Sequence, residues 1–187
     1  MDWRRLSIAT DLESALYNFS RRIVVAKSRW PVVILAGGQG VGRARAAEAV
    51  CRELGVSSLL RIDLERIRAS GENLHDLMRA LLLQQRLHGA ALYLAGFELL
   101  FDKEHQPLPE SHRLVKLLTE AKRPMFISCA ANTPWPELLG ARPAVSFRFD
   151  LPDYAIRLQL WRNAVKTVDA NIAGFIEFLC AFRIDAT

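Results

Sequence analysis

The stretch VVILAGGQGVGRARAAEAV, residues 32–50, decides the fold. Its first five residues, 32–36, form an apolar run that predicts a buried strand, and residues 43–54 have the composition of a helix. Between them stand four glycines within six residues, namely Gly37, Gly38, Gly40 and Gly42. The backbone N–H groups of such a loop, together with the N-terminus of the helix that follows, bind phosphate oxygens. The stretch therefore predicts a phosphate-binding loop in an α/β protein.

The spacing of these glycines matches the P-loop pattern G-x-x-x-x-G-K-[ST], with two departures. The matched residues, which are the candidate nucleotide-binding residues, are Gly37, Gly38, Gln39, Gly40, Val41, Gly42, Arg43 and Ala44. Arg43 keeps the positive charge of the usual lysine, but its planar fork is longer and bulkier than an ammonium group. Ala44 has no hydroxyl with which to ligate Mg²⁺. We therefore expect a loop in which Arg43 is the main cation and Mg²⁺ is not firmly held.

Two other interpretations of the same glycines stay open. The dinucleotide fingerprint G-x-G-x-x-G is half matched by Gly38 and Gly40, but Arg43 stands in place of its third glycine. Asp63 closes the next strand about 20 residues further on, as a ribose-binding acid would, although capping the turn before Glu65 is the simpler role. The other interpretation is a glycine turn that binds nothing, in which Arg43 fills the phosphate space or pairs with a local acid.

Outside this stretch, apolar runs alternate with helical patterns, which is typical of a parallel sheet covered on both faces. The expected strands are 58–63, 90–95, 124–129 and 145–149, and the expected helices are 11–26, 74–87 and 109–121. We therefore predict a doubly wound α/β domain of P-loop NTPase type over residues 1–150, with a five-stranded parallel sheet and an N-terminal helical segment at 11–26. Residues 151–187 carry two further helical patterns, 153–165 and 169–183, which we interpret as the beginning of a truncated helical lid domain.

The ends of the other strands carry few of the groups that ATP hydrolysis needs. The third strand runs ALYLAGFELLF and presents Ala95 and Gly96 where P-loop ATPases place the acids that hold Mg²⁺ and activate water. Glu98 comes two residues later, and we interpret it as an ordinary acid at a helix start. The fourth strand runs MFISCAANTPWP and places Asn132 just beyond the carboxyl end of the sheet. The Asn132 amide is suited to orient a γ-phosphate or a water, although asparagine before Thr-Pro is also ordinary turn chemistry.

Composition excludes several other classes of protein. The 187 residues are 51% hydrophobic and carry a net charge of +5 with scattered basic residues, so nucleic-acid binding is allowed but not indicated. Cys51, Cys129 and Cys180 form no CxxC pair, and the four histidines show no metal-binding spacing, so we expect neither disulfides nor a metal site. The sequence shows no signal peptide and no segment long enough to span a bilayer, so we expect a cytoplasmic protein without membrane contact.

Taken together, these segments resemble the AAA+ ATPase module of the P-loop NTPase superfamily. ILAGGQGVGRA resembles its Walker A segment, ALYLAGFE its Walker B strand, and ISCAANTPWP its sensor-1 strand, with Asn132 at the asparagine position. FRFDLPDYAIRLQLW resembles the last strand and the helix that opens the lid, and DANIAGFIEFLCAFRIDAT resembles the beginning of the lid. The resemblance covers residues 11–187 and is greatest to the degenerate first module of bacterial proteins that carry two AAA+ modules in tandem.

This resemblance implies ATP or ADP binding, a hexameric ring and the remodelling of protein partners. The departures at Arg43, Ala44, Ala95 and Gly96 imply weak nucleotide binding and argue against hydrolysis. Arg142, in LLGARPAVSF, lies near where the family places an arginine finger that reaches into the neighbouring subunit, and a solvated loop charge is the alternative. We therefore expect a degenerate module that assembles as a homo-oligomer or beside a neighbouring AAA+ module and contacts a protein partner. The alternative is a non-catalytic interaction domain that binds no nucleotide.

Overall fold

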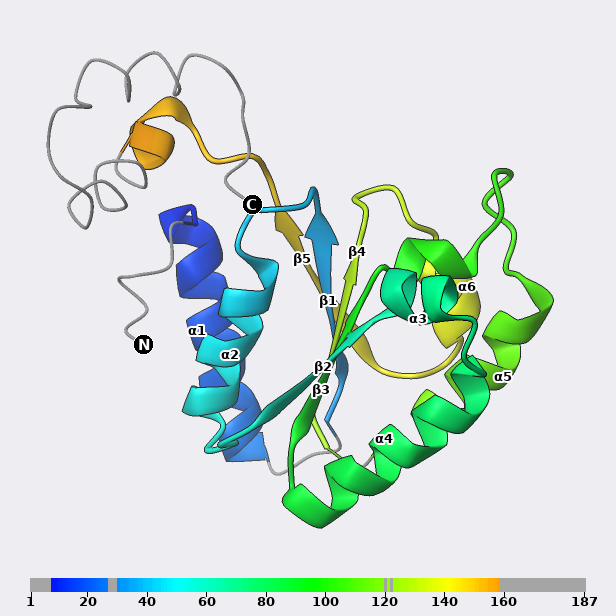
Figure 1. Cartoon of the computed structure of the whole chain (residues 1–187). Helices are drawn as coiled ribbons and strands as arrows, with labels where there is room; N and C mark the ends of the chain where they lie inside the picture. The colour runs from blue at the N-terminus through cyan, green and yellow to red at the C-terminus, as the bar shows by residue number, and fades with distance from the viewer. Residues whose placement is uncertain (1–7, 27–29, 120, 122, 159–187) are drawn as a thin grey trace, which may run out of the picture.

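The computed structural model describes residues 8–26, 30–119, 121 and 123–158, which form a parallel sheet between two layers of helices (Figure 1). No helix in these ranges combines the length and the hydropathy that crossing a membrane would need. The helices and strands, in chain order, are α1 (Thr10–Ala26), β1 (Val32–Gly37), α2 (Arg43–Glu53), β2 (Leu59–Asp63), α3 (Leu64–Ser70), α4 (Leu74–His88), β3 (Ala91–Ala95), the 3-10 helix η2 (Phe97–Leu100), α5 (Pro109–Thr119), β4 (Met125–Cys129), α6 (Trp135–Leu139) and β5 (Ala144–Phe149).

The five strands run parallel in the order β2-β3-β4-β1-β5. β1 lies inside the sheet, where Ile34 is opposite Ile127 of β4 on one side and Ser146 of β5 on the other. The predicted α/β fold with a five-stranded parallel sheet is confirmed, and each predicted strand begins and ends within one residue of the observed one. A strand that is covered on both faces needs a continuous apolar run, which is why these strands could be recognised in the sequence.

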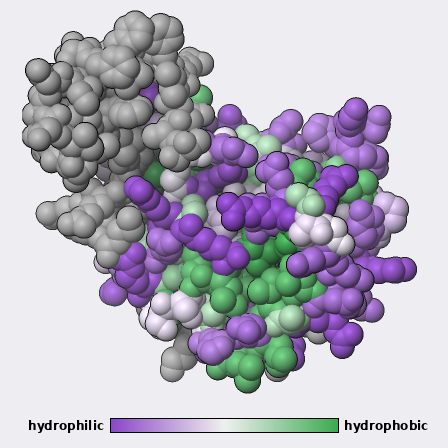
Figure 2. All heavy atoms as spheres, viewed as in Figure 1, coloured by the Kyte–Doolittle hydropathy of each residue, from purple (hydrophilic) through white to green (hydrophobic). Residues whose placement is uncertain are grey.

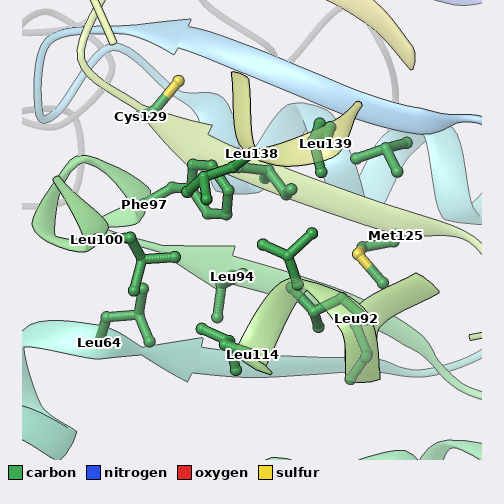
Figure 3. Close-up of a cluster of buried hydrophobic side chains, with 14 of the residues drawn as sticks. Leu64, Leu92, Leu94, Phe97, Leu100, Leu114, Met125, Cys129, Leu138 and Leu139 are labelled. Atoms are coloured by element: carbon green, nitrogen blue, oxygen red, sulfur yellow. The ribbon is translucent and has the colours of Figure 1, made fainter. Parts of the chain in front are cut away.

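The strands send alternate side chains into two apolar cores, one on each face of the sheet. Ile34 packs among side chains of α4 and α5, whereas its neighbours Val33 and Leu35 pack among side chains of α1 and α2. Figure 3 shows the first of these cores, to which the sheet contributes Leu94 of β3 and the helical layer contributes Leu114 of α5. Burying a side chain of this size contributes about 1.5–3 kcal/mol. The two cores therefore hold both helical layers against the sheet.

The connections contain the short helices α3, η2 and α6, of which the sequence predicted only a helix start at Glu98. α3 follows β2 directly, and the Asp63 carboxylate caps it by accepting from the N–H groups of Glu65 and Arg66 at 3.0 and 3.3 Å. The capping role considered for Asp63 is therefore confirmed. η2 and α6 have only four and five residues, too few to show a helical period in the sequence. The helix expected over 109–121 ends earlier, at Thr119.

After β5, the described chain ends in a short helical stretch at 154–158. The Asp153 carboxylate accepts from the N–H of Ile156 at 2.8 Å, as an N-cap does. The rest of the helix expected over 153–165, and all of the one expected over 169–183, lie outside the described residues. The boundary between domains 1–150 and 151–187 therefore stays a prediction.

Gly37, the last residue of β1, is fixed by the close packing of β1 against β5. A Cβ atom at this position would overlap the carbonyl oxygen of Phe149 and would lie 2.9 Å from the Cβ of Phe149. A Cβ atom at Gly38 would have nothing within 4 Å. The first glycine of the loop is thus required by the sheet itself, whereas the second one is open to solvent.

We expect Gly37→Ala to lower the free energy of unfolding by about 1–3 kcal/mol, because overpacking here displaces backbone rather than a flexible side chain. Urea denaturation followed by circular dichroism measures this change. Gly38→Ala is the matched control and should leave stability within about 1 kcal/mol of the parent. Equal stability of the two variants would contradict the packing argument.

Candidate functional site

The glycine loop connects the carboxyl end of β1 to the first residue of α2. Gly40 and Gly42 have φ values of 77° and 90°, in the left-handed region that glycine adopts without a steric cost. Between them, the side chain of Val41 is buried in the core beside α1 and α2 and anchors the loop. β1 and β4 are neighbours in the sheet, but the connections that follow them run in opposite directions, from β1 to β2 and from β4 to β5. Ligands of open α/β sheets bind at the carboxyl ends of two such neighbouring strands. The fold therefore places the loop where a ligand is expected.

The side chain of Arg43 extends from the start of α2 to the end of β4. Its Nη1 donates to the main-chain carbonyl of Cys129 at 2.7 Å, and Cys129 is the last residue of β4. The guanidinium is therefore half-buried at the carboxyl edge of the sheet, beside the glycine loop. Arg43 was predicted from the sequence as the cation of the loop, with a local acid as one possible partner. In the structure its partner is a carbonyl group.

A second charged group, Glu98, lies at the same edge of the sheet. The pKa of the Cys129 thiol is raised to about 11, mainly by burial. The Glu98 carboxylate contributes to this increase, whereas a hydrogen bond with Thr133 and the Arg43 guanidinium oppose it. Burial is also the main reason why the pKa of Tyr93 is raised, and Arg43 and Glu98 act on that group too. Oε2 of Glu98 is buried and has no hydrogen-bond partner among the described residues. Glu98 stands in the first turn of η2, as expected, but its influence on the pKa values of Tyr93 and Cys129 was not foreseen.

The positions that would hold Mg²⁺ in a P-loop ATPase carry no oxygen ligand on their side chains. Ala44 is the second residue of α2, and Ala95 ends β3. Gly96 follows with φ 78°, and a Cβ atom there would lie 3.3 Å from Cδ1 of Leu99. Within the described ranges, no group of three or more His, Cys, Asp or Glu side chains is arranged to hold a metal ion.

Asn132 lies in the turn that follows β4, and its side chain is exposed. The turn is closed by the N–H of Thr133, which donates to the carbonyl of Ala130 at 3.2 Å. Because β4 pairs with β1, Asn132 and the glycine loop follow neighbouring strands at the same edge of the sheet. The role of Asn132 toward a phosphate or a water stays a prediction.

Arg142 lies at the opposite, amino edge of the sheet, between α6 and β5. Its guanidinium donates to the carbonyl of Leu118 through Nη1 and to that of Ala121, 3.5 Å away, through Nη2. The Leu118 carbonyl lies in the last turn of α5 and also accepts from the N–H of Ala121, 3.1 Å away, just beyond the helix. A cation is favourable there because it complements the dipole of the helix. In the described chain Arg142 thus joins α5 to the connection before β5. Its predicted role between subunits stays a prediction.

Arg142→Ala should lower the free energy of unfolding by about 1.5–3 kcal/mol, because hydrogen bonds from a charged group to partly buried carbonyls are lost. Arg148→Ala, the control, removes an arginine near the carboxyl end of β5, whose exposed ion pair with Asp150 contributes at most about 1 kcal/mol. Chemical denaturation of both variants measures the difference. If Arg142→Ala unfolds like the parent chain, Arg142 does not support the fold.

Solved structures with this arrangement are known. The FIGL-1 AAA domain in complex with ADP is 18% identical, with a TM-score of 0.68, and the match covers 97% of this chain and 66% of that one. A katanin structure that addresses self-assembly is 17% identical, with a TM-score of 0.64 and coverages of 97% and 66%. The fold is that of an AAA ATPase domain. The RuvB Holliday junction branch migration motor of Thermotoga maritima is more distant, with 14% identity, a TM-score of 0.58 and coverages of 87% and 52%.

These similarities concern the fold, because the identities are low. The chain spans about two thirds or less of the length of the solved chains it matches. No protein-family model and no curated protein sequence matches it. Evidence about the site therefore comes from the residues themselves.

Proposed function

We propose that this chain is an AAA+ ATPase-like module with a degenerate nucleotide site, which holds ATP or ADP weakly and without firmly bound Mg²⁺. It serves assembly with a neighbouring module or a second copy of itself, and contact with a protein partner. The AAA fold and the position of the glycine loop support nucleotide binding. The katanin similarity supports assembly, since that structure concerns self-assembly.

The bond from Arg43 to the Cys129 carbonyl is the single observation that carries this proposal. It places a permanent positive charge beside the glycine loop, where the P-loop pattern has a flexible lysine. A guanidinium has five N–H groups, so it can hold the carbonyl and a phosphate oxygen together. The bond also restricts how far Arg43 can follow a nucleotide. Both effects favour weak binding of an anion that does not need a metal ion.

The backbone at Gly96 supports the absence of hydrolysis independently. A residue with a side chain is strained at φ 78°, so a catalytic acid does not fit here unless the turn between β3 and η2 changes. Ala44 and Ala95 remove two further oxygen ligands. Without the ion that bridges the β- and γ-phosphates, the leaving group is not neutralised. A module of this kind therefore acts through its shape and its contacts rather than through turnover.

A second candidate function is a non-catalytic interaction domain that binds no nucleotide. The same Arg43–Cys129 bond favours it, because the arginine has an internal acceptor and does not require a ligand. Both candidates predict that Arg43→Ala lowers stability, because the bond to Cys129 is lost. They differ in whether the parent chain binds ADP and whether Arg43→Ala weakens that binding.

We expect a fluorescent ADP analogue to bind the chain with an affinity that EDTA and excess Mg²⁺ change by less than about threefold, because Ala44, Ala95 and Gly96 offer no side-chain oxygen to the ion. Arg43→Ala should weaken binding about tenfold to a hundredfold through loss of a charge-assisted contact. It should also lower stability by about 1–2 kcal/mol, because the bond to Cys129 is lost. Fluorescence anisotropy and thermal unfolding measure the two effects.

Arg45→Ala is the matched control, because Arg45 is an exposed arginine of the same helix turn. It should leave both affinity and stability unchanged. If Arg43→Ala destabilises the chain while the parent shows no ADP binding, the interaction-domain candidate is correct. Steady ATP turnover by the parent chain at several per minute would contradict the claim of degeneracy.

Arg43→Lys combined with Ala44→Thr restores the P-loop pattern and tests whether the loop can then bind a nucleotide together with Mg²⁺. The double variant should bind the analogue more tightly with Mg²⁺ than with EDTA, by about tenfold, because a hydroxyl ligand and a lysine are back in place. ATP turnover should stay absent because Ala95 and Gly96 are unchanged. A double variant without any Mg²⁺ dependence would show that the loop does not accept a nucleotide in the usual geometry.

A further inference from the structure

β2 ends the sheet, and one of its edges is open. It pairs with β3 on one side, and no described strand pairs with its other side. The helix that follows it, α3, turns back over β3 and η2. An open edge offers unpaired N–H and C=O groups to another strand, and proteins usually cover or charge such an edge.

Apolar side chains surround this open edge. Leu83 and Leu87, one turn apart on α4, are 58% and 72% exposed, and Leu60 and Leu81 are half-buried. Figure 2 shows a continuous apolar area over β2 and α4 with hydrophilic residues around it. Such patches mark interaction surfaces when they are continuous and rimmed by polar groups. The edge of the strand and the exposed leucines of α4 thus form one surface, which we name the β2–α4 edge.

The charges on β2 are complementary to themselves in one antiparallel register. Arg61 and Asp63 lie on the same face of the strand, whereas Ile62 lies on the other, and the side chains of Arg61 and Asp63 are 53% and 46% exposed. Within the chain, Arg61 pairs with Glu48, and Asp63 pairs with Arg66 at 3.6 Å. Exposed pairs of this kind contribute at most about 1 kcal/mol, so both charges can exchange partners. If Ile62 lies on a two-fold axis, Arg61 of each copy is opposite Asp63 of the other. A slip by one residue sets the charged face against the apolar face, and a slip by two sets Arg61 against Arg61 or Asp63 against Asp63.

We propose that the β2–α4 edge binds a second copy of this chain in a two-fold dimer, in which the two β2 strands pair antiparallel and continue the sheet. Two-fold dimers use the same surface on both subunits, which is the self-complementarity that Arg61 and Asp63 provide. Leu83 and Leu87 of the two copies lie beside the joined strands and are shielded from water. The dimer is independent of the proposed nucleotide site, since β3 and β4 separate β2 from β1.

Sedimentation velocity of the 187-residue chain over a concentration series tests the dimer, with Leu87→Glu as the first variant. Because Leu87 is 72% exposed, the change should leave the melting temperature unaltered and weaken dimerisation at least about tenfold, since a charge replaces a buried apolar group in each copy. Val24→Glu, at an exposed apolar position of α1 on the other side of the sheet, is the matched control and should change nothing. A parent chain that stays monomeric up to about 0.5 mM overturns the proposal.

A charge exchange tests the register itself. Arg61→Asp places two carboxylates opposite one another at both symmetric pairs and should weaken the dimer about tenfold. Adding Asp63→Arg should restore the affinity to within about threefold of the parent, because attraction returns with the signs reversed. The double variant also loses the cap of α3, so circular dichroism must show that it is folded at the temperature used. A dimer that ignores both Leu87→Glu and Arg61→Asp uses another surface, and this outcome also overturns the proposal.

Discussion

The whole architecture depends on the complete burial of β1. This strand is covered by helices on both faces and paired with another strand on both sides, so each of its backbone groups needs a partner and each of its side chains must be apolar. The chain can leave such a strand only through a loop that fits between β4 and β5. At Gly37 the space is so limited that no side chain is accommodated next to Phe149. The close packing of β1 against β5 therefore requires a glycine at the start of the loop, whether or not a ligand binds.

The burial of β1 and the spacing of the glycines explain how much of the site could be predicted from the sequence. The strands were recognised because burial on both faces leaves continuous apolar runs, and the loop was recognised because its glycines lie between such a run and a helix. α3 was missed because the segment from Leu64 to Ser70 has only two large apolar residues, although the cap at Asp63 was a signal that could have revealed it. The short helices η2 and α6 are held by tertiary packing of Phe97 and Leu138 rather than by local pattern.

The contacts of the two key arginines could not be predicted for a different reason. Arg43 donates to the carbonyl of Cys129, and Arg142 to those of Leu118 and Ala121. Every residue carries a carbonyl group, so a main-chain acceptor leaves no mark in the sequence. Sequence reasoning looks for an acid as the partner of an arginine, and it fails where the fold itself provides the acceptor. For Glu98, the sequence shows the acid itself but not that it acts on the side chains of Tyr93 and Cys129.

The backbone at Gly96 has a consequence for the history of such a site. A catalytic centre that loses only a side chain can regain it by one substitution, and selection can restore the activity in one step. At Gly96 the left-handed conformation removes this route, because a returning acid would first destabilise the turn that it must occupy. Two changes would be needed together, one in the turn and one in the side chain. A substitution of Gly96 alone therefore does not place an acid at the end of β3 without strain.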